Sequence, residues 1–150
     1  MSLKDLAIQT DTLTLAPIVI IGDGTDVDCT SVDGKNAVAV RHILSVGESG
    51  DTWGGALYTD VILEESDDNS TFTAVTASAD FIGTMETQTS GIIKVLDAEA
   101  DDNANYEITY VGTKRYTQIA LNKTGNHATG TPMSCNAIVM PRLQGSLSPT

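Results

Sequence analysis

The sequence predicts an all-β protein: a single antiparallel β-sandwich, jelly-roll-like in outline, or a small β-barrel. Roughly nine short segments rich in Val, Ile and Thr alternate between apolar and polar residues, with turn residues between them, which is typical of sandwiches and barrels. The chain of 150 residues contains 20 Thr but only 8 Lys and Arg together, and β-branched residues favour strands. A domain of this size can fold without a metal or disulfide staple.

The first strand is expected over 12–21. Pro17 within it cannot donate a ladder hydrogen bond, so this strand should lie at a sheet edge or contain a bulge. A second, short strand is expected over 27–32. The dipeptide Asp33-Gly34 then gives a hairpin signal, which should join this strand to a long one over 37–46.

The glycine-rich segment 47–55 predicts a loop, and strict alternation predicts a strand over 56–65. The turn-forming residues 67–70 should lead into a returning strand over 72–75. The stretch 77–84 is weakly helical or irregular.

Residues 124–132 are rich in Thr and Gly and predict a long loop, while 98–104 form an acidic turn. Pro141 should end the final strand. The remaining strands are expected over 91–96, 106–111, 115–122 and 133–140.

This organisation gives one β-sandwich domain over 12–141, a polar N-terminal arm over 1–11 and a polar C-terminal tail over 142–150. Both ends lack a core-facing pattern. Leu3, Leu6 and Ile8 are the apolar residues of the N-terminal arm that a partner could bury.

The formal net charge of −12 argues against nucleic acid as a partner, because phosphate contacts need clustered Lys and Arg. No apolar run approaches the length of a membrane span. The N-terminus shows no secretory signal, so we expect synthesis in a cytoplasm.

Cys29 and Cys135 are the only cysteines. Buried, reduced thiols are the first expectation, because free cysteine is often buried. A disulfide joining an early strand to the last strand is the alternative. The spacing of Cys and His does not favour a metal site.

No pattern indicates catalysis. His42 and His127 lack a partner placed by spacing, Ser49 lacks the second glycine of a nucleophile elbow, and Glu64 and Glu65 should face opposite sides of a strand. We therefore expect no enzyme activity and no cofactor. The acids Asp23, Asp26, Asp28 and Asp33 favour solvated turns, with adventitious calcium as the alternative.

Trp53 is the only Trp and lies in the glycine-rich loop. It could stack on a sugar or anchor into a partner, as a carbohydrate-binding β-sandwich module would use it. The alternative is a loop Trp folded back over the end of the sandwich.

Two segments resemble small acidic virion proteins of tailed bacteriophages. One is 61–75, with Glu64-Glu65-Ser66-Asp67-Asp68-Asn69-Ser70. The other runs from Tyr106 through Tyr110-Val111-Gly112-Thr113-Lys114-Arg115-Tyr116 to Met140-Pro141-Arg142.

The resemblance implies a structural virion protein, most like a capsid decoration (cement) protein. Its partner would be the major capsid protein, and it would form a homotrimer on the capsid surface. A tail tube, head fibre or neck protein is the alternative. An arm can add a strand to a neighbour's open edge, so deleting residues 2–11 should weaken attachment to capsids.

Overall fold

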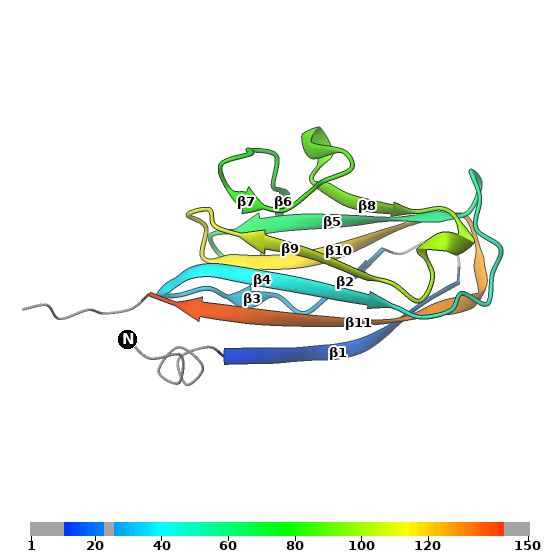
Figure 1. Ribbon diagram of the computed structural model, residues 1–150, viewed down its shortest axis with the longest axis horizontal. Helices are drawn as coiled ribbons and strands as arrows, with labels where there is room; N and C mark the ends of the chain where they lie inside the picture. Colours follow the sequence, from blue (N-terminus) through cyan, green and yellow to red (C-terminus); the bar gives the residue numbers. More distant parts are fainter. Residues whose placement is uncertain (1–10, 23–25, 143–150) are drawn as a thin grey trace, which may run out of the picture.

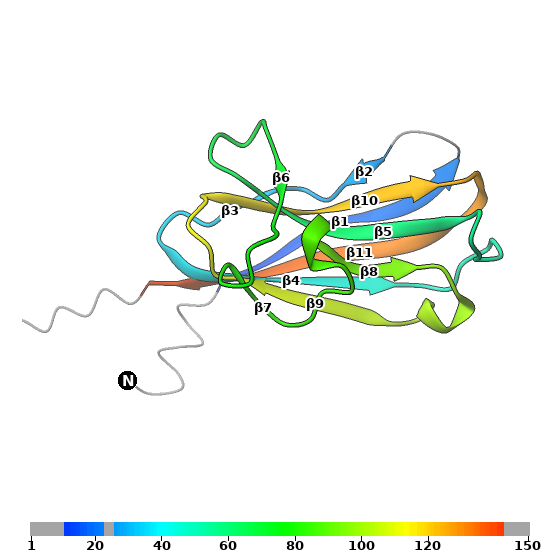
Figure 2. The same ribbon diagram turned by 90° about the horizontal axis from the view of Figure 1, so that it is seen from above.

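Two antiparallel β-sheets packed face to face make up the computed structural model, which describes residues 11–22 and 26–142 (Figures 1 and 2). The prediction of a β-sandwich is confirmed, and the barrel alternative is wrong, because the two sheets do not close into one. The described strands are β1 (Asp11–Gly22), β2 (Val27–Asp28), β3 (Val32–Asp33), β4 (Ala37–Val46), β5 (Tyr58–Ser66), β6 (Thr73–Ala74), β7 (Phe81–Ile82), β8 (Ile92–Leu96), β9 (Asn105–Tyr110), β10 (Tyr116–Thr124) and β11 (His127–Pro141).

The first sheet, sheet A, has the order β1-β11-β4-β9-β7. The second, sheet B, has β10 and β5 at its centre. Strands β2 and β3 pair with β10, and β6 and β8 pair with β5. Two short 3-10 helices, η1 (Gln88–Ser90) and η2 (Glu99–Asp101), are the helical turns of the described chain. No helix in those residues is long and apolar enough to cross a membrane.

The core lies between the sheets and is mainly aliphatic. On β4 of sheet A, Val40, His42, Leu44 and Val46 are buried, and the residues between them are more exposed. Sheet B supplies the facing layer, with Val61, Leu63, Ile119 and Leu121 all buried. The alternation of buried and more exposed residues along β4 is what period-two patterning predicts for a strand with one face on a core.

Pro17 lies on an edge strand next to a shift in register, as the sequence predicted. Strand β1 is the outer strand of sheet A and pairs with β11, and the register shifts between Thr14 and Pro17. An edge strand with a bulge tolerates a residue that has no N–H to donate.

The Asp33-Gly34 hairpin prediction is wrong. Strand β3 pairs with β10 in sheet B, whereas β4 pairs with β11 and β9 in sheet A. The chain therefore crosses between sheets at this point. Asp33 Oδ1 accepts a hydrogen bond from the Lys35 amide at 2.9 Å, and Asn36 adopts a left-handed conformation with φ 65°. These two features turn the chain without pairing the strands on either side.

The predicted loop over 124–132 is also wrong, because β11 already begins at His127. Strand β1 supplies hydrogen-bonding partners for this stretch, with Ile20 opposite Thr131 and Val19 opposite Pro132. The Pro132 carbonyl accepts from the Gly47 amide at 2.8 Å. The proline nitrogen faces the same side, where β4 has ended, so no ladder bond is lost.

Two smaller differences are local. The expected strand over 27–32 is split into β2 and β3 around Cys29, whose amide donates to the Ile119 carbonyl at 2.9 Å. The stretch 77–84 contains β7, which pairs with β9.

Cys29 and Cys135 form a disulfide between the two sheets, with a Cα–Cα distance of 6.4 Å. Both residues are buried. The structure thus has the paired alternative rather than two reduced thiols.

Candidate functional site

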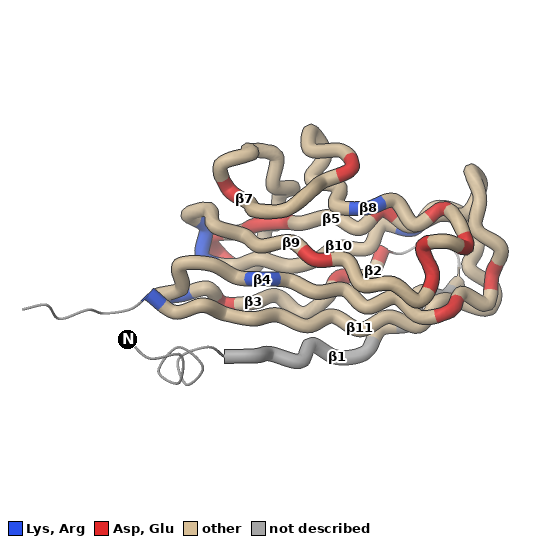
Figure 3. Tube along the Cα trace, viewed as in Figure 1, with Lys and Arg blue, Asp and Glu red and all other residues tan. Residues whose placement is uncertain are grey.

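Charge is distributed unevenly along the molecule. Figure 3 shows basic residues gathered at the end where β3 runs into β4 and β9 turns into β10, and acidic residues around η2 and the loop after β4 at the opposite end. Four of the eight Lys and Arg residues of the chain line a single cavity at the first of these ends: Lys35, Lys114, Arg115 and Arg142. We call this region the basic end.

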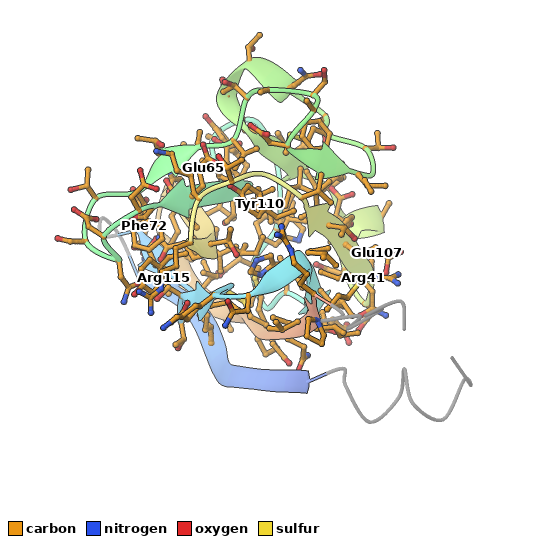
Figure 4. All side chains as sticks on the ribbon, turned by 90° about the vertical axis from the view of Figure 1, so that its left-hand side faces the viewer. Arg41, Glu65, Phe72, Glu107, Tyr110 and Arg115 are labelled. Atoms are coloured by element: carbon orange, nitrogen blue, oxygen red, sulfur yellow. A yellow bond between two sulfur atoms is a disulfide. The ribbon has the colours of Figure 1, made fainter. Side chains whose placement is uncertain are left out.

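The cavity at the basic end has a volume of about 600 Å³. Three segments form it: the crossing from β3 to β4, the turn from β9 to β10, and Arg142 just after β11. Figure 4 looks onto this end, with Tyr110 between the two sheets and Arg115 to one side. The other lining residues are mostly Gly, Ala and Val.

Backbone hydrogen bonds hold the three segments together. The Gly34 amide donates to the Arg115 carbonyl at 2.7 Å, and the Arg142 amide donates to the Asn36 carbonyl at 2.7 Å. Pro141 pairs with Ala37 at the start of β4. The basic end is therefore a preformed surface in which the sheets fix the position of each segment.

The turn from β9 to β10 folds around the ring of Tyr110. The Tyr110 hydroxyl donates to Glu65 Oε2 at 2.6 Å and accepts from the Lys114 amide at 2.9 Å. A Cβ at Gly112 would overlap this hydroxyl, so only glycine fits there. Burial and the neighbouring Glu65 carboxylate raise the pKa of Tyr110, so its hydroxyl keeps its proton.

Two of the four cations are paired with acids. Arg115 forms a two-pronged contact with Asp33, with Nε–Oδ1 at 2.9 Å and Nη2–Oδ2 at 2.6 Å. Hydrogen bonding from Arg115 lowers the pKa of Asp33 to about 2. Lys114 pairs with Asp67. Lys35 and Arg142 form no ion pair with any described residue.

This set of groups suits binding. Lysine and arginine side chains carry fixed positive charge at neutral pH, and arginine matches carboxylates with a planar fork of donors. Val38, which lines the same cavity, is 51% exposed and adds an apolar contact. The surface can therefore take a carboxylate-bearing partner with some apolar character.

Trp53 lies at the opposite end and is buried, with 7% of its surface exposed. Its Nε1 donates to Asp102 Oδ1 at 2.8 Å, and its ring meets the His127 ring edge-on at 5.6 Å. The loop is folded back over the end of the sandwich. In this arrangement Trp53 presents no exposed ring face for a sugar or a partner, because the indole is a packing and hydrogen-bonding element of the loop.

The glycine-rich loop is tied to β11. Asp51 accepts hydrogen bonds from the Thr129 amide at 2.9 Å and from the Gly130 amide at 2.7 Å. Ser49 Oγ accepts from Thr131 Oγ1 at 2.8 Å, so this hydroxyl serves the loop's own structure.

The two histidines lie in the interior. His42 Nε2 and Thr117 Oγ1 share a hydrogen bond of 2.8 Å between the sheets. His127 is fully buried against Trp53, and neither of its ring nitrogens has a partner in the described structure.

The paired acids Glu64 and Glu65 bind different residues. Gln118 Nε2 donates to Glu64 at 2.9 Å, whereas Glu65 accepts from Tyr110. Of the turn acids, Asp33 pairs with Arg115, and Asp23 lies outside the described residues. Within 11–22 and 26–142, no group of three or more His, Cys, Asp or Glu is placed to hold a metal ion.

Leu3, Leu6 and Ile8, the apolar residues of the expected arm, lie outside the described residues. Sequence reasoning did not single out the basic end. The adjacent Lys114 and Arg115 in an acidic chain are a local signal, but Lys35 and Arg142 are isolated cations that only the fold brings to the same cavity.

A comparison of the chain with models of known protein families, with curated proteins and with solved structures finds no match.

Proposed function

We propose that the protein is a non-enzymatic structural component of a tailed-phage virion, which decorates the outside of the capsid by binding the major capsid protein. It would be made in the host cytoplasm and act on the capsid surface as a homotrimer. It would need no cofactor, nucleic acid or membrane. The proposal rests on the resemblance of two segments to phage virion proteins, and on features of the surface.

The observation that carries the proposal furthest is the outer edge of β1. This strand has 12 residues and pairs with β11 but with no other described strand. At about 3.3 Å per residue the strand is about 40 Å long, and its outer edge is interrupted by Pro17 and by the register shifts on either side of 17–20. Proline and bulges limit pairing at such edges but do not cover them, and an uncovered edge can still recruit another strand. An edge of this length is suited to being covered by a neighbour in an assembly.

The acidic surface supports the same proposal. A net charge of −12 keeps separate copies apart in solution. It also favours docking onto positively charged patches, because complementary potentials speed association and set orientation. A capsid shell with basic outer patches would be such a partner.

Binding to capsid shells tests the proposal. Shells assembled from the major capsid protein of the same virus would be mixed with the full-length chain, sedimented, and imaged by cryo-EM. We expect co-sedimentation at a fixed stoichiometry and extra density on the outer surface. A chain that stays in the supernatant at saturating concentration would refute the proposal, and density on the tail or neck of complete particles would replace the capsid assignment.

The arm is tested in the same assay. Deleting residues 2–10, which precede β1, should reduce occupancy on the shell and leave the circular dichroism spectrum of the free domain unchanged. Deleting residues 143–150 removes a polar segment of similar length from the other end and serves as the matched control. Equal occupancy for the N-terminal deletion and the full chain would exclude the arm as a clamp.

A further inference from the structure

Two cations of the basic end, Lys35 and Arg142, lie outside the ion pairs of the described chain, although Asp33 and Asp67 pair with the other two cations there and Lys35 also lies within electrostatic range of Asp33. Acids outnumber bases by 20 to 8 in this sequence. Even so, Lys35 and Arg142 line the same cavity without an ion pair to any described residue. Both side chains are exposed, so they are accessible to carboxylates of another molecule.

The opposite end has the complementary charge, and we call it the acidic end. Glu48, in the loop after β4, and Asp97 and Glu99, between β8 and β9, are all exposed there. None of the three forms an ion pair with a described residue. The nearby Lys94 is already paired with Asp101 at 3.2 Å and with Glu86 at 3.3 Å.

The acidic end is also rigidly held. The Ser49 amide donates to Asp102 Oδ2 at 3.0 Å, and Trp53 binds the other oxygen of the same carboxylate. Asp102 thereby joins the loop that carries Glu48 to the segment that carries Asp97 and Glu99. The exposed acids thus come from two segments that are fixed to one another, as the cations of the basic end also are.

We propose that the basic end of one copy binds the acidic end of a second copy, so that the chains associate head to tail. Charge complementarity favours a second copy as the occupant, because every copy carries both a basic end and an acidic end. Val38, which lines the cavity of the basic end and is 51% exposed, offers apolar surface to the same partner. A contact between unlike ends is heterologous, and it closes into a ring when the rotation per copy permits.

This inference deepens the proposed function and rests on it for one point, that three copies associate on the capsid surface. The interaction itself can be measured without a capsid. At about 0.1 M ionic strength, charges further apart than about 10 Å are screened, which reduces the repulsion between copies of net charge −12 but not the attraction between ends in contact. At about 1 M the screening length falls to about 3 Å and the contact itself should weaken.

The first experiment measures self-association of the full-length chain by sedimentation velocity at high protein concentration, in about 0.1 M and about 1 M NaCl. We expect oligomers at the lower of these salt concentrations and a shift toward monomer at the higher. Lys35→Glu and Arg142→Glu should each weaken association by about tenfold. Arg41→Glu makes the same charge change on the outer side of β4, where Arg41 pairs with Glu107, and it should have a much smaller effect.

A charge swap tests the partners directly. Lys35→Glu with Arg142→Glu reverses the two cations of the basic end that have no ion pair, and Glu48→Lys with Glu99→Lys reverses two of the three exposed acids of the acidic end, leaving Asp97. Each double variant should associate more weakly than the unaltered chain, and mixing the two should restore association. Circular dichroism and thermal melting confirm that both variants fold.

Carbodiimide crosslinking gives a second readout on the unaltered chain, because it joins a carboxylate to an amine only at contact. The crossing from β3 to β4, which carries Lys35, and the connection from β8 to β9, which carries Glu99, lie at opposite ends of the sandwich (Figure 1). A peptide joining Lys35 to Glu48, Asp97 or Glu99 must therefore come from two copies. A chain that stays monomeric at all salt and protein concentrations, or oligomers that are unchanged by reversal at either end, would overturn the proposal. Failure of capsid binding with intact self-association would refute the proposed function alone.

Discussion

His42 should make the fold sensitive to mild acid. The side chain is buried between the sheets, with 1% of its surface exposed, and burial lowers its pKa from 6.5 to about 4. Between these values the unfolded chain binds a proton that the folded chain does not, so the free energy of unfolding falls as the pH falls. A pKa difference of about 2.5 corresponds to about 3 kcal/mol, lost between pH 6.5 and pH 4.

The assay is urea denaturation of wild type and His42→Gln at steps from pH 7.5 to pH 4. Carboxylates titrate in both proteins, so the difference between the two curves isolates the contribution of His42. We expect the variant to lose about 3 kcal/mol less than wild type across this range. Near pH 7.5, about one unit above the ordinary pKa of 6.5, His42 is almost entirely neutral in both states, and the two pH profiles should become parallel.

Thr117→Val is the matched control for His42. It removes the hydrogen-bonding partner of His42 Nε2 but leaves the imidazole to titrate in the same buried position. The free energy of unfolding should fall by about 1 kcal/mol at every pH, without a change in slope. If His42→Gln and wild type show the same pH dependence between pH 6.5 and pH 4, the reasoning from burial is wrong.

Two further predictions concern the disulfide and the glycine-rich loop. Reduction of the bond between Cys29 and Cys135, which are 106 residues apart, should lower the free energy of unfolding by about 4–5 kcal/mol. Denaturation with and without dithiothreitol measures this loss, and an unchanged midpoint would contradict it. Mass spectrometry checks that the bond exists, because its reduction adds two hydrogens, about 2 Da. Gly50→Ala would place a Cβ against the Thr129 methyl and should cost roughly 1–3 kcal/mol, whereas Gly54→Ala adds a Cβ in open space and should be nearly neutral. Equal midpoints for the two variants would show that the loop does not pack on β11 as described.

Local pattern predicted the strands that bury one face on the core. The segment 37–46 alternates so regularly that it coincides with β4, and Pro17 correctly placed the first strand at an edge. The alternation pattern did not predict strands whose pairing partner lies far away in the sequence. The start of β11 looks like a loop because it is rich in Thr and Gly, yet pairing with β1 makes it a strand.

Turn-forming residues predicted where the chain changes direction, but not which strands the turn joins. Asp33 and Gly34 do mark a change in chain direction, and the Asp33 side chain caps the turn. No local signal distinguishes a hairpin within one sheet from a crossing between two, because that choice depends on which strands β3 and β4 find. The same limit applies to Cys29 and Cys135, whose pairing depends on how the two sheets stack.

The net charge alone could not predict the basic end, because the fold decides where the charged residues gather. A sum of −12 describes a uniformly acidic particle, which should bind basic surfaces and repel its own copies. The fold instead brings Lys35, Lys114, Arg115 and Arg142, from three segments, to one cavity, and it leaves exposed acids at the far end. Under the proposed head-to-tail contact, long-range repulsion between copies and short-range attraction between their unlike ends would act together. Such a molecule would stay dispersed at low concentration and would associate in one orientation when a surface concentrates it.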